Sequence, residues 1–473
     1  MAGVSFSGIA SGLDTESLIK AASSATRRIK VDPLQRKVQE LTDTNDALDT
    51  LSSRLLRLRT QANKFSTLSG GPLEKSTTTS NESVLTAAAG RGTPSGSYEV
   101  VVSQLARNGV FSFNDRWSDT SSVINSSIDN NAPAADRTIK IAMGLGTSQE
   151  TISLELTNTT TPAELVDSFN SQATKGVATL VNVGTTSSPS YAISFTASSE
   201  GTQEGTVELV LPIGSELSAG TPALQAGTSQ AAADAQFSIS GISGTITRSS
   251  NTVTNVIPGL SLNLRSLGTS TLTVRDNATG SAQLMRDFID QLNDVMTFTK
   301  EANAISQQEE KNELVTTYGP LSQTSVDEGI LGAIRSAIAS AEAPSGSSIR
   351  IFADLGITTQ RDGNLAFDEE KFRAAIAAEP SSVDTMLKKF GDTIGKTGGT
   401  IDLYTRFSGL IDEVRNGNKT SITDTNARIA EAEKAITKAE LDARARYARF
   451  ESLMGNLQSQ GSQLSSVLAS LGG

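Results

Sequence analysis

The chain has 473 residues, a formal net charge of −11 and neither cysteine nor histidine. These absences exclude thiol nucleophiles, disulfides, the usual zinc sites and the Ser-His-Asp triad, although a carboxylate or lysine mechanism stays open. No motif in the sequence supports an active site, and we expect neither an enzyme nor a cofactor. The acidic balance argues against a nucleic-acid partner, because phosphate recognition favours a basic face. The length allows several domains with cores of their own.

The N-terminal residues up to Ser11 are small and polar, and we expect them to be disordered. They lack the basic and apolar regions of an ordinary secretory signal, and no stretch approaches the ~20 apolar residues of a membrane span. Asp14 is the predicted N-cap of a short helix. The pair Asp32-Pro33 predicts a second helix start, with Asp32 as N-cap and Pro33 at the first helical position.

A long amphipathic helix is expected after Pro33, ending before the Gly70-Gly71-Pro72 sequence. Its basic clusters, Arg27–Lys30 just before it and Arg54–Arg59 within it, are interpreted as solvated helix faces. Asn45 falls on the seam, where a polar residue specifies register at a cost in stability. The seam positions, spaced by three and four residues, are Leu34, Val38, Leu41, Asn45, Leu48, Leu51, Leu55, Leu58, Ala62 and Phe65.

Between residues 76 and 277 the pattern changes to short Ser/Thr/Val-rich runs that predict β-strands. Within this region Thr161-Pro-Ala-Glu164 predicts the start of one short helix. The expected strands are residues 98–102, 138–143, 151–156, 191–196, 206–211, 237–240, 245–247, 252–254, 260–264 and 271–274.

Helices return from Ser281 and again over 325–341, followed by a hairpin whose turn is Asp362-Gly363. Asp368 is the predicted N-cap of the next helix. The acidic residues 362–369 do not match the calcium-loop pattern, and a turn plus a cap accounts for them. The sequence therefore gives no reason to expect a metal site.

The C-terminal helix is expected to begin near Thr420, with Ile422, Ile429 and Ile436 seven residues apart. Small residues, Ala432 and Ala439, occupy the partner positions. No charged residue follows Glu451. This uncharged tail is either a buried or frayed helix end or a surface that packs into another subunit.

The terminal repeats need partner helices, and the nearest candidates are each other. We predict an α+β multidomain protein in which the N- and C-terminal helices pair as a coiled-coil-like stalk. A helical bundle domain follows, and two β-rich head domains are inserted in the middle. The predicted domains are residues 1–42 with 425–473, 43–80 with 278–424, 81–108 with 235–277, and 109–234.

An ordered set of short sequences resembles flagellar filament caps, the flagellar hook-associated protein 2 family. Residues 108–235 carry no family motif. The matching sequences are Ser7–Thr15 (SGIASGLDT) with Leu18-Ile19, Pro33-Leu34-Gln35, Tyr98–Ala106 (YEVVVSQLA), Ser250–Leu262 (SNTVTNVIPGLSL), Leu355–Thr359 (LGITT) with Asp362–Leu365 (DGNL), and Phe450–Met454 (FESLM) with Ser459-Gln460.

The resemblance implies a secreted homo-oligomer, a ring of five or six copies, at the extracellular tip of the flagellum. Its implied partners are flagellin, the type III export apparatus and an export chaperone at the C-terminal helix, with host glycans as a further candidate. The export signal would include Gly8, Ile9, Gly12 and Leu13. The expected leg, oligomer and filament contacts are Leu18, Ile19, Leu34, Val38, Leu41, Asn45, Leu48, Ile429, Ile436, Tyr447, Phe450, Met454, Leu457, Leu464 and Leu468.

Two other functions fit the same layout. A hook–filament junction protein would share the helical ends and the β-rich middle. A surface adhesin with a glycan-binding head would share the Ser/Thr-rich middle.

Overall fold

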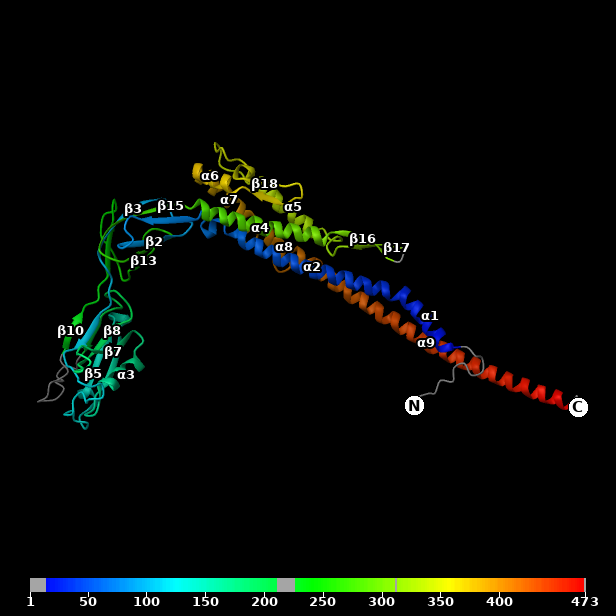
Figure 1. Ribbon diagram of the computed structural model, residues 1–473, viewed down its shortest axis with the longest axis horizontal. Helices are drawn as coiled ribbons and strands as arrows, with labels where there is room; N and C mark the ends of the chain where they lie inside the picture. Colours follow the sequence, from blue (N-terminus) through cyan, green and yellow to red (C-terminus); the bar gives the residue numbers. More distant parts are fainter. Residues whose placement is uncertain (1–13, 211–225, 311–312, 472–473) are drawn as a thin grey trace. The chain divides into compact units, whose positions relative to one another are not determined.

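A computed structural model describes residues 14–210, 226–310 and 313–471, which form two compact units. The first unit combines residues 1–72 with 282–473, and the second comprises residues 73–281. The middle of the chain is thus inserted into a unit that both ends build. Figure 1 shows the elements of each unit.

The first unit is mainly helical, with two short hairpins. Its hairpins pair β16 (Ile305–Glu310) with β17 (Glu313–Tyr318), and β18 (Ile357–Thr359) with β19 (Leu365–Phe367). Its helices are α1 (Thr15–Lys30), α2 (Asp32–Asn63), α4 (Ala278–Ala302, which begins in the second unit), α5 (Val326–Ser340), α6 (Glu369–Ala378), α7 (Pro380–Ile394), α8 (Thr400–Thr405) and α9 (Leu410–Leu471), with short 3-10 turns η1 (Thr67–Ser69) and η4 (Phe352–Leu355).

The core of this unit is an aromatic cluster beside the leucine stripe of α2. The rings of Phe288 and Phe390 meet edge to face, with centroids 5.2 Å apart, and Phe65 packs on Phe288 at 5.9 Å. Such edge-to-face pairs add to the stabilisation that comes from apolar burial. Leu51, Leu55 and other stripe residues are fully buried, as their spacing predicts.

One expected helix cap and one expected helix start are wrong. Asp32 is the first residue of α2, and the preceding Val31 keeps a helical backbone and donates its N–H to the carbonyl of Arg27. Because α1 runs into α2 with no extended residue between them, Asp32 already has a helical backbone and does not act as the N-cap. The C-terminal helix begins at Leu410, ten residues before Thr420.

The earlier start of α9 has a tertiary cause. The segment contains Gly417 between two asparagines, which by itself disfavours a helix. Two neighbours nevertheless bond to α2: Asn418 donates to Asn45 at 3.0 Å, and Arg415 pairs with Asp49 at 2.7 Å. Those contacts stabilise the helical conformation of α9 on both sides of Gly417. The capping predictions for Asp14 and Asp368 are confirmed, since their carboxylates accept from Ser17 and Lys371 N–H groups.

The second unit contains two β-rich cores, each formed by antiparallel strands. One core lies between a sheet of order β1-β15-β3-β11-β12 and a sheet of order β13-β14-β2. The strands are β1 (Lys75–Thr79), β2 (Leu85–Ala89), β3 (Gly96–Gln104), β11 (Ala235–Ile239), β12 (Ile246–Arg248), β13 (Thr252–Thr254), β14 (Leu260–Leu264) and β15 (Gly268–Asp276). The first and last strands, β1 and β15, pair with each other, which brings the two ends of the insertion together.

The other core packs one helix, α3 (Pro162–Gln172), with sheets of order β10-β4-β8-β7 and β6-β5-β9. Thr161 caps α3 in a capping box with Glu164, as predicted. Sequence reading missed β4, β7 and β10. The strands are β4 (Val110–Phe113), β5 (Thr138–Met143), β6 (Glu150–Glu155), β7 (Gly176–Asn182), β8 (Tyr191–Ala197), β9 (Val207–Val210) and β10 (Ala226–Gln230).

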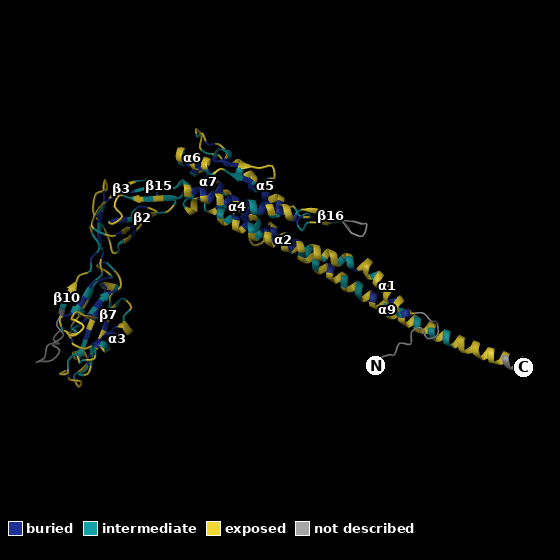
Figure 2. Ribbon diagram, in the orientation of Figure 1, coloured by how far each residue is buried: buried dark blue, intermediate teal, exposed yellow. Residues whose placement is uncertain are grey.

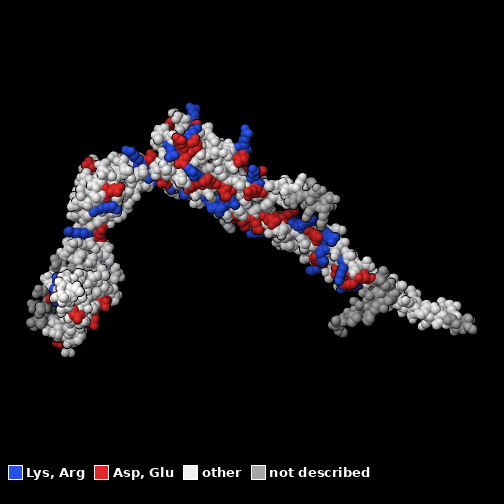
Figure 3. Space-filling model, viewed as in Figure 1, with Lys and Arg blue, Asp and Glu red and all other residues white. Residues whose placement is uncertain are grey.

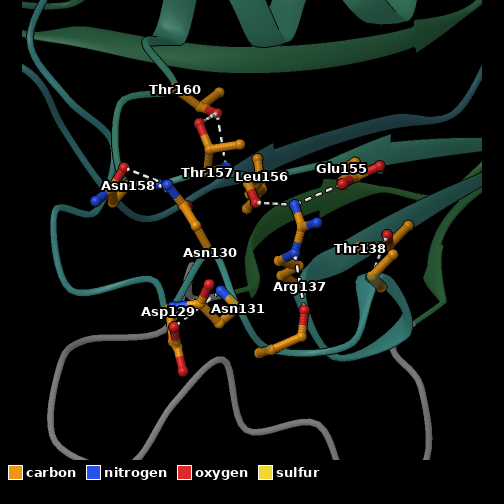
Figure 4. A network of polar contacts seen from close by, with 12 residues as sticks. Asp129, Asn130, Asn131, Arg137, Thr138, Glu155, Leu156, Thr157, Asn158 and Thr160 are labelled. Carbon is orange, nitrogen blue, oxygen red and sulfur yellow. Dashed lines mark hydrogen bonds and ion pairs between the residues drawn. The ribbon is translucent and has the colours of Figure 1, made fainter.

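A polar network secures the long loop before β5 (Figure 4). The Arg137 guanidinium donates to the carbonyl oxygens of Ala132 and Leu156 and pairs with Glu155 at 2.5 Å. Asn130 and the Asn158 segment bond to each other through side chain and backbone. Each polar group in this surface network thus has a partner within the fold, and we assign the network a structural role.

A carboxylate in the first unit makes folding stability depend on pH. Hydroxyls of Ser347, Ser348 and Ser382 and the Ser348 N–H donate to Glu379, at distances of 2.5 to 3.0 Å. These donors, first of all Ser347, lower the pKa of Glu379 to about 2. Because this pKa lies below the ordinary value of 4.5, the stabilisation is complete above pH 4.5 and is lost as the pH falls toward 2.

We predict that Glu379→Gln lowers the free energy of unfolding at pH 7 and that the gap to the wild type closes between about pH 5 and pH 2. Urea unfolding at a series of pH values measures this gap. Glu342→Gln, which changes an exposed glutamate of the same unit, is the control and should show no such closure. A gap that stays constant with pH would contradict the assigned role of Glu379.

Candidate binding surface along the terminal helices

The two ends of the chain meet along α9. Asn45 of α2 bonds to Asn418, and Asp49 pairs with Arg415, so rising numbers on α2 meet falling numbers on α9. The α1 helix continues the same antiparallel order, with Arg27 on Glu433. Figure 1 shows α1 and α2 following α9 for most of its length.

The α2–α9 contact is the firmer part of this surface. Leu48 is fully buried, and Asn45 is only 9% exposed. A buried amide must find a partner, and Asn45 accepts from the Asn418 side chain at 3.0 Å. Since a one-turn slip would leave both amides unpaired, this bond favours one register of the two helices.

The α1–α9 contact is thinner and relies on charge. Ile19 and Ile436 are buried, but most of α1 is exposed, and Ile29 is 76% exposed. A groove of about 200 Å³ remains between the helices and is lined by Ile19, Ala439 and Tyr447, among others. With little apolar contact, α1 is stabilised on α9 less strongly than α2 is.

Two ion pairs hold α1 in place. The Arg27 guanidinium donates hydrogen bonds to both carboxylate oxygens of Glu433, at 2.9 and 2.6 Å, and Arg444 pairs with Glu16 at 2.8 Å. The bond from Arg27 lowers the pKa of Glu433, and Glu433 in turn raises the pKa of Arg27. The pairs have opposite orientation, with the cation on α1 in one and on α9 in the other, and a one-turn shift of α1 along α9 would break both of them.

These pairs correct the sequence-based interpretation of the basic clusters as solvated faces. Arg27 binds α9, Arg54 pairs with Asp294 of α4, and Arg59 pairs with the buried Asp402 at 2.7 Å. Sequence reading missed Glu433, Asn418 and Arg415 as contact residues. No local signal could have found them, because each partner lies more than 350 positions away in the chain.

The predicted contact residues differ in exposure. Ile19, Asn45, Leu48 and Ile436 are buried, and Leu18, Phe450, Leu457, Leu464 and Leu468 are exposed. Half-buried are Leu34, Val38, Leu41, Ile429, Tyr447 and Met454. The predicted export residues Gly8, Ile9, Gly12 and Leu13 lie outside the described residues.

The last four turns of α9 carry no charge, and they expose a row of leucines in an otherwise Ser- and Gln-rich sequence. Leu457, Leu464 and Leu468 are 56, 65 and 64% exposed. Figure 2 shows this end of α9 as mostly exposed, and Figure 3 shows it without Lys, Arg, Asp or Glu side chains on the visible face. A row of exposed leucines on one helix is typical of a face that packs on another protein.

Across residues 14–210, 226–310 and 313–471, no three acidic side chains gather in a way that could hold a metal ion. In the same ranges, every helix is too short or too polar to cross a membrane.

Comparison with known protein families identifies the family of the chain. The model for the N-terminus of flagellar hook-associated protein 2 matches residues 11–109, and the model for its C-terminus matches residues 232–459. The chain belongs to the flagellar hook-associated protein 2 family. The first match includes α1 and α2, and the second includes most of α9. Between them lie residues 110–231, which hold most of the α3-containing core.

Two relatives align over nearly the whole chain. The A-type flagellar hook-associated protein 2 of Pseudomonas aeruginosa is 24% identical over 98% of this chain and 97% of its own length. The flagellar hook-associated protein 2 of Escherichia coli K12 is also 24% identical, over 100% of this chain and 96% of its own length. The chain is thus similar in extent to both relatives.

A solved structure shares the fold. The D1-D2-D3 domains of the flagellar cap protein FliD from Escherichia coli superpose with a TM-score of 0.57. They are 21% identical and cover 79% of this chain and 99% of that chain.

We predict that Arg27→Glu and Glu433→Arg each loosen α1, and that the double variant restores its docking because the charges are exchanged. Hydrogen exchange of the α1 amides should accelerate by up to about fivefold in each single variant, as expected for an exposed ion pair. Arg28→Glu, which makes the same charge change one residue away, is the control and should leave exchange unchanged. Equal exchange in all four variants would refute a role for the pair.

Proposed function

We propose that this protein caps the distal end of the bacterial flagellar filament. The observation that carries the proposal is family membership over both terminal regions, together with a fold shared with a flagellar cap protein. The protein acts as a structural assembly factor and not as an enzyme. Its place of action is extracellular, at the filament tip.

In this proposal the terminal helices serve as legs. Residues 1–42 with 425–473 form the coiled-coil-like stalk, residues 43–80 with 278–424 the helical domain, and residues 81–108 with 235–277 and 109–234 the two heads. Five or six copies form a ring whose heads make a plate. The exposed leucines at the end of α9 suit the legs for contacts in filament grooves.

The partners follow from the same role. Flagellin leaves the type III export apparatus, folds beneath the plate and joins the filament, and the cap then moves to the next site. The cap itself is exported by the same apparatus, with a chaperone on the uncharged end of α9. The small apolar contact between α1 and α9 supports this cycle, because a leg of marginal stability can both bind the filament and release it.

Deletion of the gene tests the function. We expect bare hooks with monomeric flagellin in the culture medium, and restoration of filaments by the gene supplied in trans. Filaments of normal length in the deletion strain would overturn the cap proposal.

We predict that Ala432→Leu with Ala439→Leu stiffens the legs and slows filament growth. Ala439 lines the groove between α1 and α9, where each added methylene contributes about 0.8 kcal/mol when buried. Pulse labelling of filaments measures growth, and hydrogen exchange of α1 reports stiffness. Ala435→Leu with Ala445→Leu, at positions of the same helix outside the lining of this groove, is the control. Better protected α1 amides with unchanged growth would contradict the idea.

A further inference from the structure

Two chain segments connect the two β-rich cores of the second unit. One runs from β3 to β4 and includes Arg107, and the other runs from β10 to β11 and includes Ala233. Between the two cores these segments pair through an isolated bridge, in which Arg107 and Ala233 exchange hydrogen bonds of 2.9 and 3.1 Å. Because an isolated pair of strands is only marginally stable, this connection by itself would act as a hinge.

A loop of the α3-containing core lies against this connection. It joins β8 to β9, and three successive residues of it, residues 200–202, bind outside their own core. We call residues 200–202 the strap. The loop is also fixed to its own core, since Gln203 and Leu145 exchange two hydrogen bonds of 2.8 and 2.7 Å, and Glu204 pairs with Lys175 at 2.8 Å. The strap is therefore a fixed part of the α3-containing core.

Glu200, the first strap residue, binds Asn251, which precedes β13. The Glu200 carboxylate accepts hydrogen bonds from the backbone N–H and the side-chain amide of Asn251, both at 3.0 Å. The same amide donates to the Ala106 carbonyl oxygen at 2.8 Å, and its oxygen accepts from the Ala106 N–H at 2.9 Å. Asn251 thus joins the strap to the segment that leaves β3. A carboxylate of the same shape could not replace this amide, because it has no hydrogen to donate.

The other two strap residues fit closely against the same core. Gly201 has a φ of 84°, and a Cβ on it would lie 2.6 Å from the Ser249 carbonyl oxygen, so only glycine allows this approach. The Gly201 N–H donates to the Arg107 carbonyl oxygen at 3.2 Å. Thr202 donates from its N–H and its hydroxyl to the two carboxylate oxygens of Asp234, at 2.8 and 2.9 Å.

These contacts restrict the connection more than the bridge alone does. The strap binds Asn251, Asp234 and the Arg107 carbonyl oxygen, which lie on three different segments outside the α3-containing core. Bending or twisting at the bridge would therefore break several bonds at once. Two of the acceptors are carboxylates, Glu200 from one core and Asp234 from the other. Hydrogen bonds to carboxylates are stronger than those between neutral groups.

We propose that the strap locks the two β-rich cores into one rigid body, with Glu200 and Asp234 as the positioning residues. The regions that the family models match supply Asp234 and Asn251, and the strap lies in the segment between those matches. The inference rests on contacts within the second unit and not on the proposed function. For the proposed cap it means that the α3-containing core keeps one orientation relative to the other core in every copy of the ring.

Distance measurements between two spin labels test the lock, because the chain has no cysteine of its own. Thr78→Cys in β1 and Thr179→Cys in β7 place one label at an exposed position of each core. The labelled full-length protein is diluted with unlabelled protein, so that distances within one copy are measured. We expect a single narrow distance distribution. Glu200→Ala with Asp234→Ala should abolish it and give a broad distribution.

Two controls accompany this measurement. Glu82→Ala with Glu208→Ala removes two exposed carboxylates of the same unit and should leave the distribution narrow. A label pair inside one core, Ser153→Cys with Thr179→Cys, should stay narrow in every variant. A narrow distribution between the cores without the two strap carboxylates, or a broad one in the control, would overturn the inference. Broadening inside one core would do the same, because the strap would then support that core and not the joint.

A second variant disrupts the lock from the other core. Asn251→Asp keeps the shape of the side chain but places a carboxylate against Glu200 and the Ala106 carbonyl oxygen. The distance distribution between the cores should therefore broaden. Asn263→Asp, at an exposed position of β14, is the control and should leave it narrow. An unchanged distribution in Asn251→Asp would contradict the lock.

Hydrogen exchange provides an independent readout. In Glu200→Ala the Asn251 N–H loses its acceptor and should exchange up to about tenfold faster, the factor that corresponds to one hydrogen bond. The Leu264 N–H, which donates to the Asn251 carbonyl oxygen at 2.9 Å within one core, should be unaffected. Equal exchange of the Asn251 N–H in the variant and the wild type would refute the role of Glu200.

Discussion

Antiparallel packing of α2 on α9 is the contact on which the first unit depends. The two helices come from opposite ends of the chain, and the Asn45–Asn418 bond with the Asp49–Arg415 pair fixes one register between them. The ion pairs between α1 and α9 follow the same antiparallel order. The long insertion of residues 73–281 is compatible with it, because β1 and β15 bring the two ends of the insertion together.

Stability along the terminal helices decreases toward the chain ends. Near α7 and α8, the leucine side chains of α2 are fully buried, and the aromatic cluster around Phe288 packs beside them. Farther out, α1 retains the buried Ile19 and two ion pairs, and the last turns of α9 are exposed along their leucine row. Because apolar burial provides most of the stabilisation, the outer segments open more readily than the inner ones. A gradient of this kind agrees with the proposal that the terminal helices are legs that bind and release.

The inserted unit follows a different principle. Its two cores are each closed by their own sheets, and its surface networks, such as the one around Arg137, satisfy their polar groups internally. In the core that contains β3 and β14, the sequence pattern predicts β3, β11, β12, β13, β14 and β15 but misses β1 and β2. The α3-containing core lies mostly in the region between the two family matches. Its fold is maintained by buried aromatic rings, with Phe169 and Phe195 4.9 Å apart.

The sequence by itself determined the local elements and the family. Helix caps at Asp14, Thr161 and Asp368 depend on bonds that span three residues, and strands such as Thr252–Thr254 on alternating burial, so both can be read from neighbours in the chain. The tertiary structure alone decided that Arg27 meets Glu433, that α9 continues through Gly417, and that Phe407 is exposed. Those features depend on the register of segments several hundred residues apart, and no local periodicity specifies which turn of one helix faces which turn of another.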